Sequence, residues 1–104
     1  MLNKKPTMID FYLISDSEEK PSSDKMNNLD YAGGLEMDIY QRLVSKGIID
    51  SRFNYYTDFR WENQLIQQID SKAKNFTSDT DVKKLKEIID NAVILESGLI
   101  AVGD

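Results

Sequence analysis

The chain has 104 residues, of which 40% are apolar, and a formal net charge of −5, which is typical of one small soluble domain. It contains no cysteine and no histidine, so disulfides, cysteine-type zinc sites and catalysis by Ser-His-Asp or Cys-His groups are excluded. The negative charge and the lack of a basic stripe argue against binding to nucleic acid. The composition therefore favours a protein without catalytic machinery, and we predict that it is not an enzyme.

Residues 1–7 are interpreted as a flexible N-terminal tail. The apolar run over residues 8–14 is too short for a typical helix and predicts a central strand. It carries Asp10 and no cleavage site follows it, so it does not read as a signal peptide. No stretch approaches the ~20 apolar residues of a membrane span. We therefore expect a cytoplasmic protein that makes no contact with a membrane.

Residues 15–34 contain Pro21, Gly33 and Gly34 and show no periodic pattern, which predicts a long loop. An amphipathic helix is expected over residues 35–46, because Leu35 begins a four-residue apolar repeat. Gly47 would end this helix as its C′ residue.

Residues 52–57 alternate aromatic and polar side chains, which predicts a half-buried strand. A second helix should start after Asp58 as its N-cap and run to residue 73, with a break at residues 75–79. A third helix follows, with one apolar face formed by Val82, Leu85, Ile88, Ile89 and Ala92. Gly98 then separates it from a short apolar strand over residues 99–102.

These elements predict a single α+β domain over residues 8–104, a small two-layer domain with roughly three strands and three helices packed on one face. The first and last strands should pair centrally, with the strand at 52–57 beside them. The expected buried residues are Leu35, Ile39, Leu43, Trp61, Leu65, Ile69, Leu85 and Ile89, over a sheet containing Phe11, Leu13 and Ile100.

The acidic segment at residues 15–38 holds seven acids and two lysines, a net charge of −5 that equals the charge of the whole chain. Clustered charge can steer a basic partner, or it can simply keep a loop solvated. The spacing of the acids does not match a calcium loop, and no lysine follows the two glycines to hold a phosphate. We therefore predict no metal and no cofactor.

Half of the ten aromatic residues fall within residues 53–61. Three of them, Phe53, Tyr55 and Trp61, are expected in the core. Tyr56 should face the other side of its strand and Phe59 should lie at the helix entrance, so both are candidate contact residues. Together with the acids, the candidate partner-binding residues are Asp16, Glu18, Glu19, Asp24, Asp30, Tyr56 and Phe59.

In size, charge and composition, with the acidic segment at residues 15–38 and the aromatic stretch at 55–59, the chain resembles the small acidic immunity proteins that bacteria make against their own toxins. The resemblance implies a non-catalytic inhibitor that occludes a basic, nuclease-like toxin or effector. Two alternatives remain open from the residues: a small accessory or regulatory subunit that acts through oligomerisation, for example as a homodimer, and an uncharacterised carboxylate-dependent enzyme.

Overall fold

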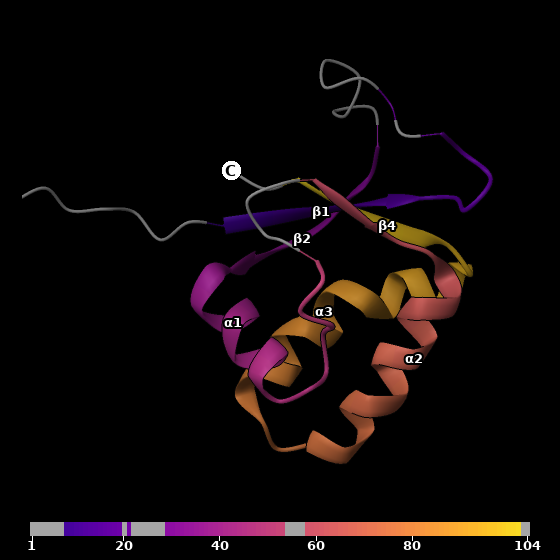
Figure 1. Ribbon diagram of the computed structural model, residues 1–104. Coiled ribbons are helices and arrows are strands. Elements are labelled where there is room, and N and C mark those ends of the chain that lie inside the picture. Colours follow the sequence, from indigo (N-terminus) through magenta and orange to yellow (C-terminus); the bar gives the residue numbers. More distant parts are fainter. Residues whose placement is uncertain (1–7, 20, 22–28, 54–57, 103–104) are drawn as a thin grey trace, which may run out of the picture.

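A computed structural model describes residues 8–19, 21, 29–53 and 58–102 (Figure 1). Within these residues the elements are β1 (Met8–Ile14), β2 (Tyr31–Glu36), α1 (Met37–Ser45), β3 (Phe59–Trp61), α2 (Asn63–Ala73), the 3₁₀ turn η2 (Lys74–Phe76), α3 (Thr80–Leu95) and β4 (Gly98–Val102). Among the described residues, no helix is long and apolar enough to span a membrane. The combination of strands and helices makes this an α+β domain, as the sequence pattern predicts.

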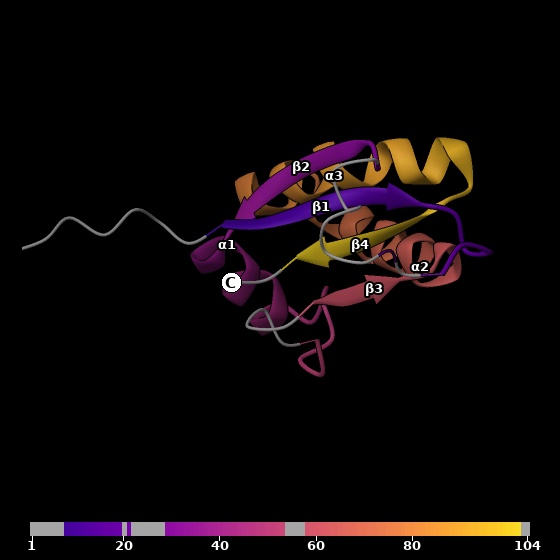
Figure 2. The same ribbon diagram turned by 90° about the horizontal axis from the view of Figure 1, so that it is seen from above.

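The strands form one antiparallel sheet in the order β2-β1-β4-β3. The first and last strands pair at its centre, with Phe11 opposite Ala101. Figures 1 and 2 show all three α-helices on the same face of the sheet. The two-layer arrangement and the central pairing of the terminal strands are thus confirmed, but the described sheet has four strands rather than about three.

The additional strand is β2, which occupies residues expected to form the end of a loop and the start of a helix. Its glycines suggested a loop, but Gly33 is needed because α3 packs closely beneath it. Gly33 has φ +141°, and a Cβ there would lie 3.0 Å from Cγ1 of Ile88. Leu35 is buried as expected, although it lies in the strand and α1 begins only at Met37.

The strand that the structure describes in this region is β3, where Phe59 pairs with Ala101 and Trp61 with Leu99. Arg52 and Phe53 are in a turn, and residues 54–57 lie outside the described part of the chain. The following helix begins at Asn63 rather than just after Asp58. The strand predicted at 52–57 therefore stays a prediction, whereas β3 was not predicted, because sequence alone does not show that Phe59 and Trp61 find a neighbouring strand.

The core lies between the sheet and the helices, with Trp61 fully buried and its ring 5.2 Å from that of Phe11. The expected buried residues are buried except Leu65 and Leu13, which are partly exposed. The face of α3 predicted to be apolar is buried throughout. Ile14 and Ile100 are also buried, but on the opposite face of the sheet, where Tyr12, Leu29 and Val102 pack against them.

An ion-pair cluster joins the end of α1 to the start of α3. Asp81 is buried and accepts hydrogen bonds from Arg42 Nε at 2.8 Å, Arg42 Nη2 at 3.0 Å and Lys46 Nζ at 3.0 Å. The neighbouring Asp79 caps α3 by accepting from the backbone amide of Asp81 at 2.8 Å and binds Lys46 at 2.6 Å. The hydrogen bonds from Arg42, reinforced by Lys46, lower the pKa of Asp81 to about 2 although its burial acts in the opposite direction.

Candidate functional site

The acidic turn, residues 15–19, follows β1 and is held against the sheet by Arg60 of β3. The guanidinium of Arg60 donates from Nη2 to the carbonyl oxygen of Ser15 and from Nη1 to that of Glu18, both at 2.6 Å. A further backbone hydrogen bond from Glu18 to Ser15 at 2.9 Å closes the turn itself. The turn is therefore fixed at two points by one cation from a distant strand.

Asp16 has a structural role at the start of α2. Its carboxylate accepts hydrogen bonds from the backbone amide of Asn63 at 3.0 and 3.2 Å, whereas Glu62 occupies the N-cap position without a side-chain cap. A carboxylate is favourable there because the first amides of a helix lack intrahelical partners and carry partial positive charge. Asp16 is thus not a free loop charge, and replacing it would disturb the helix as well as the charge of the turn.

The carboxylates of Glu18 and Glu19 are exposed and form no ion pair within the described residues. Asp30 is exposed as well, and its carbonyl oxygen accepts from the amide of Leu13 at 2.8 Å, near the end of β1 that leads into the acidic turn. Four predicted site residues (Asp16, Glu18, Glu19 and Asp30) therefore lie around the same end of the central strand.

The remaining predicted site residues are placed differently. Phe59 lies in β3 rather than at a helix entrance and is only partly exposed. Its ring stands 5.5 Å from that of Phe53 and 5.6 Å from that of Trp61, so packing in the core accounts for its position. Asp24 and Tyr56 lie outside the described residues, and their part in binding stays a prediction.

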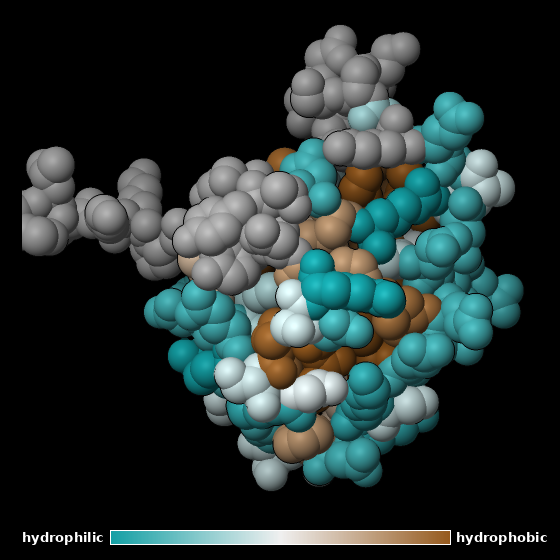
Figure 3. Space-filling model, viewed as in Figure 1, coloured by the Kyte–Doolittle hydropathy of each residue, from teal (hydrophilic) through white to brown (hydrophobic). Residues whose placement is uncertain are grey.

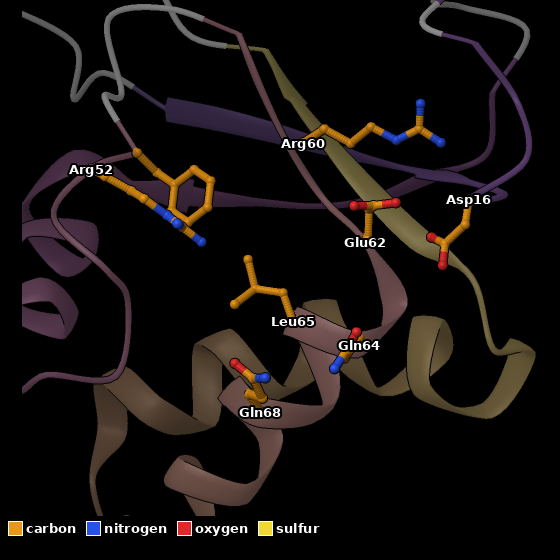
Figure 4. Close-up of a pocket in the computed structure, with 8 residues that line it drawn as sticks. Asp16, Arg52, Arg60, Glu62, Gln64, Leu65 and Gln68 are labelled. Carbon is orange, nitrogen blue, oxygen red and sulfur yellow. The ribbon is translucent and has the colours of Figure 1, made fainter.

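A groove of about 460 Å³ adjoins the acidic turn. Figure 3 shows apolar surface gathered between the segment that follows α1 and helix α2, with hydrophilic side chains around it. The groove is lined by Asp16, Arg52, Phe53, Arg60, Glu62, Gln64, Leu65 and Gln68. In Figure 4, Leu65 and the two glutamines rise from α2, while Arg60 extends from β3 toward the turn that carries Asp16.

The charged groups of the groove differ in whether they are already engaged. Arg60 is bound to the acidic turn, and Arg52 lies over the Phe53 ring and 3.7 Å from Asp50. The exposed carboxylate of Glu62 makes no side-chain hydrogen bond or ion pair within the described residues. Glu62 therefore adds a free negative charge to those of Glu18 and Glu19 beside a partly apolar floor.

Sequence reasoning missed the groove because its walls come from distant segments. The sequence pattern predicts one helix over Arg60, Glu62 and Leu65, with Leu65 buried. The sequence feature that could have predicted β3 is the alternation around Trp61, because the charged residues Arg60 and Glu62 flank this buried aromatic residue. That alternation is typical of a strand with one buried face, and it correctly describes β3.

No three or more acidic side chains in the described part of the chain are arranged to hold a metal ion. Comparison with known families found no model that matches the chain, and comparisons with curated proteins and with solved structures found no significant match. The interpretation of the site therefore depends on its own geometry.

Proposed function

We propose that this chain is a non-catalytic protein-binding domain that inhibits a basic partner, in the manner of an acidic immunity protein that occludes a nuclease-like toxin. The observation that carries the proposal is the acidic turn. It presents two carboxylates, Glu18 and Glu19, that form no ion pair within the described residues, on a backbone that Arg60 holds in place. Negative charges on a fixed backbone can steer a cationic surface while little conformational entropy is lost on binding.

The groove beside the turn supports the same proposal. Its lining includes Phe53, Leu65 and the carboxylate of Glu62, which has no side-chain partner in the described part of the chain. Lysine and arginine side chains have an aliphatic stem and a charged head, so one such side chain can lie over Phe53 and Leu65 and pair with Glu62. Nuclease active sites are rich in these side chains because they bind phosphate backbones, and an acidic protein seated there would block the substrate.

The test starts by capturing the tagged chain with its bound proteins from its native cell. The proposal expects a basic protein with nuclease activity that loses this activity when one equivalent of the purified chain is added. Capture of no basic protein, or of one whose activity the chain leaves unchanged, would contradict the proposal.

The role of the acidic turn is then measured by binding kinetics with the Glu18→Gln/Glu19→Gln variant at about 50 mM and about 500 mM salt. We expect the association rate constant to fall by roughly three- to tenfold at low salt, and the difference to shrink at high salt. The Glu87→Gln/Glu96→Gln variant is the matched control, because it removes the same charge from exposed positions of α3 and the residue after it. Equal effects of the two variants would show that only net charge matters.

A further inference from the structure

The two edges of the sheet differ in how well they are protected. β3 has only three residues, and short edge strands pair poorly with other chains. β2 has six residues, Tyr31–Glu36, and carries no lysine, no proline and no charge before its last residue. Lysine, proline and charged side chains usually protect edge strands from pairing, and β2 lacks this protection before Glu36. A bulge interrupts its pairing with β1 near Tyr31, but the stretch from Gly33 to Glu36 is regular. Among the described strands, β2 is therefore the edge to which a further strand can pair.

Exposed apolar side chains gather on the elements at this same edge. The large hydrophobic residues that are exposed in the described part of the chain are Met8 (40%), Tyr31 (57%), Ile94 (76%) and Leu95 (63%). Met8 begins β1 opposite Glu36, Tyr31 begins β2, and the other two end α3. Figure 2 shows α3 running along β2, with its last turns extending past the start of that strand. Met8 and Tyr31 lie beside Gly34 on the outer face of the sheet, and Leu95 lies at the end of α3 on the helix face, so exposed apolar groups flank β2 on both faces.

Leu95 belongs to the side of α3 that faces the β2 edge. Ile88 lies against Gly33 of β2, close enough for a Cβ on that glycine to come within 3.0 Å of its side chain. Leu95 follows Ile88 by seven residues, which is two helical turns, so both side chains project from nearly the same side of the helix. Leu95 is thus an apolar residue beside the β2 edge, and it is exposed whereas Ile88 is buried.

β2 is complementary to itself in an antiparallel register centred on Gly34. Residues directly opposite each other must point to the same face of the sheet. In this register Gly34 meets its own copy on the outer face, and Gly33 meets Leu35 on the helix face. Tyr31, shifted by the bulge, meets Glu36 on the outer face. The two Glu36 carboxylates stand about 14 Å apart along the strands, whereas a parallel pairing would place these like charges side by side.

We propose that two copies of this chain form a two-fold symmetric dimer in which their β2 strands pair antiparallel and the apolar ends of α3 are covered. A basic partner is not the occupant that this edge favours, because Tyr31–Leu35 carry no charge that would attract one. By the two-fold symmetry of this pairing, the α3 helices of the two copies run antiparallel to each other. This dimer does not depend on the proposed inhibitor function, since the acidic turn and the groove lie elsewhere.

The test is sedimentation equilibrium of the full chain at concentrations from about 1 to about 200 µM, where a dimer of about 24 kDa is expected from a chain of 12.0 kDa. Tyr31→Glu should weaken dimerisation at least about tenfold, because it faces Glu36 of the second copy with a like charge. Adding Glu36→Lys to that variant should restore the dimer, since opposite charges then face each other. Leu95→Lys should also weaken it, and Ser71→Lys on the exposed surface of α2 should have no effect.

Hydrogen exchange gives an independent readout. The amides of β2 that point away from β1 should exchange more slowly as the protein concentration rises, while those of α2 should not change. Circular dichroism of each variant ensures that only folded chains are compared, and Leu95→Lys replaces Tyr31→Glu if the latter unfolds. A monomeric wild-type chain at about 200 µM overturns the proposal. The proposal is also overturned if neither Tyr31→Glu nor Leu95→Lys weakens the dimer, or if adding Glu36→Lys to Tyr31→Glu does not restore it.

Discussion

Replacing Asp81 by asparagine tests the ion-pair cluster that joins α1 to α3. Asparagine keeps the shape of the side chain but removes the negative charge that Arg42 and Lys46 share. The pKa of Asp81 is lowered from 3.8 to about 2, and each pKa unit corresponds to about 1.4 kcal/mol of free energy of unfolding. The shift therefore sets an upper value of roughly 2.5 kcal/mol. Because the Arg42 side chain is 55% exposed, screening by water lowers the expected loss to about 1 kcal/mol.

The sign of the pH dependence follows from the lowered pKa. The charged form of Asp81 is favoured in the folded chain, so its contribution is complete above the unfolded pKa of 3.8 and disappears as the pH falls through about 2. Urea denaturation of the wild type and of Asp81→Asn should therefore differ by about 1 kcal/mol at pH 7 and much less near pH 2.

The matched control is Asp90→Asn on the same helix. Asp90 is 52% exposed and lies 3.4 Å from Lys86, so its loss should cost no more than about 0.5 kcal/mol. A difference between wild type and Asp81→Asn that stays constant from pH 7 to pH 2 would refute the electrostatic explanation. So would an Asp81→Asn variant no less stable than Asp90→Asn at pH 7.

Further substitutions separate buried from surface roles. Leu85→Ala should lower the free energy of unfolding by about 3–5 kcal/mol because Leu85 is fully buried. Leu65→Ala at the partly exposed groove should lower it by only about 1–2 kcal/mol. Equal losses in urea denaturation would show that the groove is closed in solution. Asp16→Ala should destabilise the chain by about 1 kcal/mol through loss of the amide contacts at the start of α2, whereas Glu18→Ala should change thermal unfolding little. An Asp16→Ala variant as stable as the wild type would contradict the capping role. Gly33→Ala should cost about 1–3 kcal/mol because its φ of +141° and the contact with α3 both oppose a Cβ, so a fully stable variant would exclude this packing.

The sequence alone determined the elements whose apolar pattern is strong and local. The runs over Met8–Ile14 and Gly98–Val102 are dense enough in apolar residues to be recognised as buried strands, and they pair at the centre of the sheet. The apolar face of Thr80–Leu95, from Val82 to Ala92, repeats at helical spacing over about three turns and is buried as predicted. These features follow from the repeat of side chains along a single segment, which needs no knowledge of its neighbours. The α+β class and the layer of helices on one face follow from them.

The edge strands and the candidate site were decided only by tertiary structure. A three-residue strand such as Phe59–Trp61 and a glycine-containing one such as Tyr31–Glu36 have little preference of their own, and they become strands because a distant partner satisfies their backbone groups. The acidic turn depends in the same way on Arg60, which is 42 and 45 residues away from the carbonyl groups that it binds. The charge of residues 15–38 can be counted in the sequence, but which carboxylates are free and which stabilise a helix depends on contacts between segments that are far apart in the chain.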